Sequence, residues 1–238
     1  MNPNTIVLLE TGNPVDMSWQ DRIKGIIEAW YPGQAGGQAI AEILTGSVNP
    51  SGHLPITFPA NLGQTPRPDL EGLGTPWPPA DRFDEGTPTT IRYDVGAEVG
   101  YRWFAKTGAR PLYAFGYGLN YTSFDYSDLE VSGGETITAI FTVTNTGDRD
   151  GADVPQLYLT EAAGDERMPL LSFEQVELQP GQSRSVTVTA DPRLLARYDG
   201  DACQWHIAEG NYRVGLGKAP DDLVLMAEAP LIERLFGR

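Results

Sequence analysis

The sequence has very few cysteines and histidines. Its 238 residues include one cysteine, Cys203, and two histidines, His53 and His206. A single cysteine excludes an internal disulfide and a cysteine-based zinc site. A site built on imidazoles would need the two distant histidines to converge, so we expect no bound metal.

Long hydrophobic runs and an excess of basic residues are also missing. No stretch of about 18 apolar residues occurs, which predicts no membrane-spanning helix and no membrane partner. The first residues, MNPNTIVLL, lack the basic segment and longer apolar region of a signal peptide. The 32 acidic residues outnumber the 17 Lys and Arg, giving a net charge of −15. Such a surface repels phosphate backbones, so we expect no nucleic-acid partner.

The beginning of the chain has α/β character. Ile6–Leu9 is a short apolar run that predicts a strand covered on both faces, and a Gly-Asn-Pro turn follows it. Ser18–Asp21 is similar to a capping box and predicts the start of a helix. The apolar face of this helix comprises Ile23, Ile26, Ile27 and Trp30.

A second helix is predicted after Pro32-Gly33, ending at Gly46. Its expected buried stripe consists of Ala35, Ala39, Ile40, Ile43 and Leu44. Leu54–Phe58 then predicts a short extended segment. This half of the chain therefore contains too few strands to close a sheet.

Residues 59–90 are rich in Pro and Gly, which predicts a long irregular excursion, either a functional loop or a plain connection. Regular structure is expected again at Val99–Phe104 and in the aromatic run Tyr113–Tyr121.

Beyond residue 126 the hydrophobic period becomes that of strands. About seven short alternating segments separated by turns indicate an antiparallel β-sandwich. These segments are Thr136–Val143, Val154–Thr160, Leu171–Leu178, Ser185–Thr189, Gln204–Ala208, Tyr212–Leu216 and Leu223–Ala227. We expect two unlike domains, residues 1–125 and 126–238, joined near Phe124–Ser127.

Several long motifs resemble a known family. EAWYPGQAGGQAIAEILTGSVNPSGHLPITFP (28–59) and VGYRWFAKTGARPLYAFGYGLNYTSFDY (99–126) are similar to the second domain of glycoside hydrolase family 3. ADVPQLYLTEAA, PLLSFEQVELQPGQSRSVTVTADPRLLARYD and WHIAEGNYRVGLG resemble the fibronectin type III-like domain that follows in many bacterial β-glucosidases. Two departures are His53, where the family usually has Arg, and Asn120, where Ser is common.

The resemblance implies a partial α/β sandwich followed by an immunoglobulin/fibronectin III-like sandwich. It also implies a retaining β-glucosidase that acts on β-glucosides or oligosaccharides without a metal or an organic cofactor. In the family, the nucleophilic Asp lies in a barrel, and the acid/base Glu lies upstream of the segment that matches Val7–Val15. Both positions would precede Met1, so we expect no catalytic residue here and no hydrolysis by this chain alone.

The same resemblance suggests what the chain contacts and where it acts. An exposed parallel strand edge is expected to pair with the missing N-terminal region or with another copy of the chain. The parent enzyme is expected in the periplasm or outside the cell, although no targeting signal is recognised in this sequence.

The best-placed candidates for the rim of a cleft are Glu10, Asn13 and Asp16, because ligands bind beyond the carboxyl ends of strands in open α/β sheets. The alternative is that Asn13-Pro14 shapes a turn and Asp16 satisfies nearby backbone amides.

Two other functions stay open. Ser51-Gly52-His53 brings Ser and His together for an esterase, although no Gly-x-Ser-x-Gly elbow occurs. A carbohydrate-binding or interaction module would present exposed aromatic rings to sugars, and the same aromatics are also typical of a core. The candidates are Trp77, Tyr93, Trp103, Tyr117 and Trp205.

Overall fold

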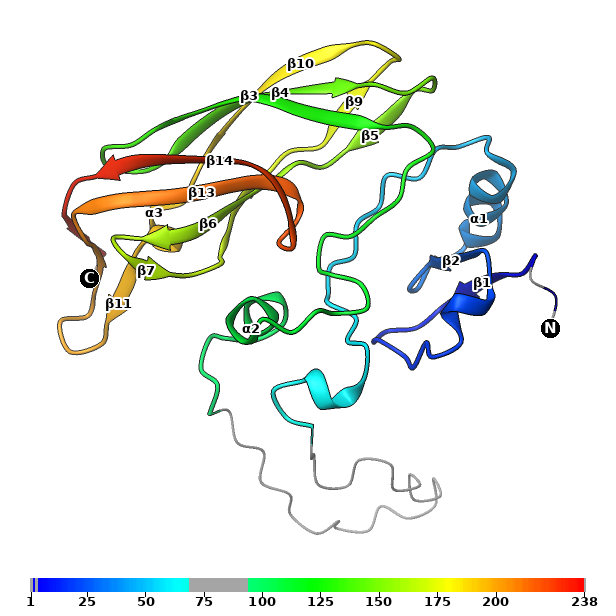
Figure 1. Ribbon diagram of the computed structural model, residues 1–238, viewed down its shortest axis with the longest axis horizontal. Helices are drawn as coiled ribbons and strands as arrows, with labels where there is room; N and C mark the ends of the chain where they lie inside the picture. Colours follow the sequence, from blue (N-terminus) through cyan, green and yellow to red (C-terminus); the bar gives the residue numbers. More distant parts are fainter. Residues whose placement is uncertain (1, 3, 69–93, 238) are drawn as a thin grey trace, which may run out of the picture.

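The computed structural model describes residues 2, 4–68 and 94–237. They form an N-terminal α/β unit and a C-terminal β-sandwich that lie side by side (Figure 1). This arrangement confirms the predicted order of an α/β part followed by an all-β sandwich. Trp77 and Tyr93 and most of the Pro/Gly-rich excursion lie outside the described residues.

The first strand, β1 (Ile6–Leu9), forms where predicted, but it is not covered on both faces, because Ile6 and Leu8 are exposed. The predicted helix after it does not form. Residues Gln20–Arg22 make only a 3-10 turn, and Gly25–Glu28 form a second strand, β2, parallel to β1. The spacing of the Ile residues fits a helix, yet Gly25 and the β-branched side chains favour extension once β1 offers a partner. Pairing with β1 therefore determines that Gly25–Glu28 is a strand and not part of a helix.

The second predicted helix is confirmed as α1 (Gly36–Thr45). It ends at Gly46, whose φ of 75° gives the left-handed C-cap for which glycine is suited. The predicted buried stripe is partly wrong: Ile40 and Ile43 are half-buried, whereas Ala35, Ala39 and Leu44 are exposed. In the described part of the chain, one apolar side of α1 faces outward.

The extended segment predicted at Leu54–Phe58 and the regular structure predicted for Tyr113–Tyr121 do not form strands or helices; these two segments are mostly irregular and pair with each other at one β-bridge. Phe58, which is buried, forms an isolated antiparallel β-bridge with Tyr113. The Leu54 N–H donates a hydrogen bond to the Tyr117 carbonyl at 2.8 Å. The helix α2 (Tyr101–Thr107) begins within the predicted regular stretch Val99–Phe104 and continues beyond it. A second 3-10 turn, Leu62–Gln64, begins the excursion.

The sandwich contains the predicted antiparallel strands and several more, except that the single strand predicted at Leu171–Leu178 forms two strands, Leu170–Phe173 and Val176–Leu178, in different sheets. One sheet has the order β10-β4-β3, and the larger sheet has the order β14-β13-β6-β7, with β8 also on β6. The predicted segments correspond to β4 (Thr138–Asn145), β6 (Gln156–Ala162), β8 (Leu170–Phe173) with β9 (Val176–Leu178), β10 (Ser183–Thr189), β12 (Gln204–Ile207), β13 (Gly210–Ala219) and β14 (Asp222–Leu231). Additional elements are β3 (Phe124–Ser132), β5 (Gly151–Asp153), β7 (Asp165–Glu166), α3 (Pro192–Leu195), β11 (Arg197–Asp199) and β15 (Arg234–Phe236).

Strand β3 begins at Phe124, so the expected domain junction lies at the start of a strand. The apolar core lies in the sandwich and follows the alternation of its strands: on β4, Phe141 and Val143 are buried while Ile140 is exposed. No helix in the described ranges is long and apolar enough to span a bilayer.

Side-chain amides join the two units. Asn49 Nδ2 donates to the Asp150 carbonyl at 2.9 Å, and Asn120 Nδ2 donates to the Ala152 carbonyl at 2.8 Å. Asn120, a departure from the family pattern, therefore binds the edge of the sandwich. These contacts fix the segment before β3 against strand β5.

Candidate functional site

The loop after β1 carries the three residues predicted to lie at a cleft rim. Asp16 Oδ1 accepts a hydrogen bond from the Ser18 N–H at 2.8 Å, so this carboxylate supports its own turn. Thr11 Oγ1 donates to the Asn13 carbonyl at 3.0 Å, and Glu10 is exposed. These contacts favour the alternative in which this segment shapes a turn and Asp16 satisfies a backbone amide.

Glu28, at the end of β2, was missed as a residue of this site because the sequence placed it in a helix. Its carboxylate accepts hydrogen bonds from Thr11 Oγ1 at 3.1 Å and from the Trp30 N–H at 3.0 Å. Glu28 therefore ties the loop after β1 to β2. The available signal was a carboxylate directly after an apolar run, as in Leu9-Glu10.

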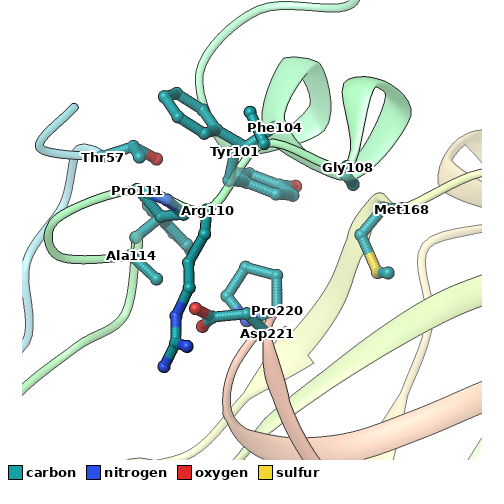
Figure 2. A pocket seen from close by; sticks show the side chains of 13 residues that line it. Thr57, Tyr101, Phe104, Gly108, Arg110, Pro111, Ala114, Met168, Pro220 and Asp221 are labelled. Carbon is teal, nitrogen blue, oxygen red and sulfur yellow. The ribbon is translucent and has the colours of Figure 1, made fainter. Parts of the chain in front are cut away.

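One hollow borders this loop, and a second hollow shares part of its lining. One of about 410 Å³ is lined by Asn13, so one of the three predicted rim residues borders a cavity. The other, of about 400 Å³, lies between α2 and two loops of the sandwich (Figure 2). Both hollows share Thr57, Tyr101 and Phe115.

A buried polar cluster lies where the α/β unit meets the sandwich. The Tyr126 hydroxyl donates to Asp153 Oδ2 at 2.6 Å, and His53 Nε2 lies 3.7 Å from Asp153 Oδ1. Burial lowers the pKa of His53, against the opposing effect of the Asp153 carboxylate. Burial, followed by the Asp153 charge, raises the pKa of Tyr126, so its hydroxyl keeps the proton that it donates.

This cluster does not provide a serine nucleophile. His53 Nδ1 lies 3.1 Å from the Ser51 carbonyl, and Nε2 faces Asp153, so both ring nitrogens lie beside oxygen atoms other than a serine hydroxyl. A Ser-His-Asp arrangement needs one nitrogen on the carboxylate and the other on the nucleophile. The geometry argues against the esterase hypothesis.

The described aromatic candidates mostly serve packing. Trp103 Nε1 donates to the Gln64 carbonyl at 2.9 Å, and Trp205 packs edge-on against Tyr198. Tyr117 is exposed but lies beside Tyr113, with ring centroids 5.1 Å apart. Within the described residues, no group of three or more His, Cys, Asp or Glu side chains is arranged to hold a metal.

Comparison with known families supports the two-part organisation. Residues 1–121 match the glycosyl hydrolase family 3 C-terminal domain, and residues 153–219 match the fibronectin type III-like domain. The chain belongs to glycoside hydrolase family 3. It corresponds to the C-terminal region of the β-glucosidases in that family.

Family 3 relatives match nearly the whole chain. Thermostable β-glucosidase B of Acetivibrio thermocellus is 37% identical over 230 residues, which cover 93% of this chain and 29% of the relative. β-Glucosidase B of Emericella nidulans is 35% identical and covers 97% of this chain and 28% of the relative. The chain thus spans less than a third of the length of these relatives.

Solved family 3 structures show the same fold. β-Glucosidase 3B of Thermotoga neapolitana, in complex with glucose, has a TM-score of 0.84 and 36% identity, over 98% of this chain and 32% of that one. The family 3 β-glucosidase of Bifidobacterium adolescentis has a TM-score of 0.83 and 33% identity, over 98% and 33% of the two chains.

Proposed function

We propose that this chain provides the C-terminal part of a retaining β-glucosidase that releases terminal non-reducing β-D-glucosyl residues. The carrying observation is its similarity, over nearly its full length, to the C-terminal 28–29% of family 3 β-glucosidases. The family resemblance assigns the nucleophile and the acid/base to regions of those enzymes outside the matched part. We further propose that the chain alone does not hydrolyse glucosides.

The chemistry of the reaction supports the proposal that this chain alone is inactive. Retaining hydrolysis needs two carboxyl groups about 5–5.5 Å apart, one to attack the anomeric carbon and one to protonate the leaving oxygen. The Asp16 carboxylate is bound to a backbone N–H of its own turn, and Glu28 is held by Thr11 and Trp30. In our proposal Glu10, Asn13 and Asp16 shape the rim of a cleft and take no part in bond cleavage.

The α/β unit presents a surface suited to the remainder of the family 3 fold. Parallel sheets are normally covered on both faces, yet Ile6 is 53% and Leu8 is 41% exposed. Among the described residues, β1 pairs only with β2. We propose that this edge and face pack against the N-terminal barrel-bearing region or, in its absence, against a second copy of the chain.

A complementation assay tests the proposal. The chain is assayed with p-nitrophenyl β-D-glucopyranoside, alone and mixed with a Thermotoga neapolitana β-glucosidase 3B polypeptide that lacks the region matched by this chain. We expect no turnover by either polypeptide alone and measurable turnover by the mixture. Turnover by this chain alone, abolished by replacing one of its own acids, would overturn the proposal.

A surface variant provides the matched control. Leu8→Asp places a charge on the proposed contact face and is expected to abolish complementation. Val224→Asp, at a similarly exposed site on β14 of the sandwich, is expected to leave it intact. Sedimentation velocity of the isolated chain reports the self-association, which Leu8→Asp is expected to reduce.

A further inference from the structure

The hollow between α2 and the sandwich has walls from both units. Tyr101, Phe104 and Phe115 come from the α/β unit, whereas Met168 and Asp221 come from loops of the sandwich. Its volume of about 400 Å³ is in the range of small-molecule sites. The site exists only when the two units are packed together.

The floor of the hollow is aromatic and fixed in place. The rings of Tyr101 and Phe115 stack with centroids 4.8 Å apart, and Tyr101 also meets Tyr158 edge-on. The Tyr101 hydroxyl accepts a hydrogen bond from the Leu170 N–H at 2.9 Å, which keeps its own proton available for another acceptor. A ligand therefore finds a rigid apolar surface with a hydroxyl at its edge.

Polar side chains, including one basic and one acidic residue, also line the hollow. Arg110, from the segment after α2, and Asp221, from the turn between β13 and β14, both line the hollow (Figure 2). Within the described part of the chain, neither side chain makes a hydrogen bond or an ion pair. Thr57 Oγ1, also on the lining, is buried without a hydrogen-bond partner among those residues.

These groups together select a ligand class. The Arg110 side chain has only hydrogen-bond donors and the Asp221 carboxylate has only hydrogen-bond acceptors. A small ligand that binds both must therefore accept hydrogen bonds from one and donate them to the other. An anion would be repelled by Asp221 and by the net charge of −15, and a cation by Arg110. A neutral molecule with an apolar face and a ring of hydroxyls meets all of these requirements.

We propose that this hollow is a binding site for a neutral pyranose sugar. The apolar face of the sugar packs on the Tyr101–Phe115 pair, and its hydroxyls bind Arg110, Asp221 and Thr57. The proposal concerns binding by this chain itself and does not depend on the proposed hydrolytic function. From the size of a hexose, the dissociation constant is on the order of millimolar.

Titration of the full chain with methyl β-D-glucopyranoside, followed by NMR of the labelled protein, tests the site. We expect saturable shifts on Tyr101, Phe115 and Met168, and much weaker binding of cyclohexanol, which lacks the ring of hydroxyls. Chemical shifts that do not saturate even at sugar concentrations well above the millimolar range would overturn the proposal. So would shifts confined to another surface, or equal binding of cyclohexanol.

Exposed variants provide a second readout that leaves the core intact. Arg110→Gln and Asp221→Asn each remove one charged partner and are expected to weaken binding about tenfold. Asp222→Asn, the adjacent residue outside the lining, and Arg184→Gln, on β10, are the matched controls and should bind like the wild type. Unchanged affinity in both lining variants, or equal loss in the controls, contradicts the assignment.

Discussion

His53 Nε2 lies 3.7 Å from Asp153 Oδ1, across the boundary between the α/β unit and the sandwich. The carboxylate is almost fully buried and is held on its other oxygen by Tyr126 at 2.6 Å. Lys218 also acts on this imidazole through its charge, and the Ser51 carbonyl lies beside its second nitrogen. The contact between the two units is therefore a titratable one.

We predict that His53 makes the stability of the chain depend on pH. Burial lowers its pKa below the ordinary value of 6.5, so between the two values the unfolded chain binds more protons than the folded one. The stabilisation of the folded chain that neutral His53 provides is present above pH 6.5, and it is lost as the pH falls toward the pKa of His53 in the folded chain.

Urea unfolding at a series of pH values measures this effect. The wild type is expected to lose more stability on acidification than His53→Gln. His206→Gln, which removes an imidazole that is 41% exposed, is the matched control for the substitution itself. Parallel curves for wild type and His53→Gln would show that the burial of His53 has no effect on proton binding.

Tyr126→Phe is predicted to destabilise the chain by about 1–3 kcal/mol, because it leaves a buried carboxylate without its donor. The free energy of unfolding from urea titration is the measurement. Tyr198→Phe removes a hydroxyl from an exposed tyrosine and should change that free energy little. Equal effects of the two variants would mean that Asp153 finds another donor.

Gly116→Ala is predicted to disturb the packing of Gln156. Gly116 has a φ of 80°, and an added Cβ would come within about 2.5 Å of Gln156 Oε1, a buried side chain that binds the Lys218 carbonyl. Gly181→Ala has a similar φ of 74° but open space around it. We expect Gly116→Ala to cost about 1–3 kcal/mol more than this control in thermal or urea unfolding.

Phe141→Ala tests the alternation of β4. Phe141 is 1% exposed, and its truncation is expected to cost about 3–5 kcal/mol because it leaves a cavity in the sandwich core. Ile140→Ala, one position earlier and 43% exposed, should cost far less. Similar losses of unfolding free energy in the two variants would contradict the register of the β4 strand.

Sequence periodicity predicted the sandwich well and the first α/β elements less well. On β4 and β10 each strand has one buried face, so alternation in the sequence reports the strand directly. Ile23 to Trp30 fit a helical face, and only the presence of β1 made Gly25–Glu28 a strand. Of the three predicted rim residues, Asn13 borders a hollow, and the role of all three stays a proposal.

By itself, the sequence determined the family, the order of an α/β part and a β-sandwich, and the helix that ends at Gly46, because local patterns and long motifs encode them. Tertiary structure alone decided the Tyr126–Asp153–His53 cluster and the hollow beside Tyr101. Their residues lie far apart along the chain, so no local spacing reports them. They meet only because the two units pack against each other.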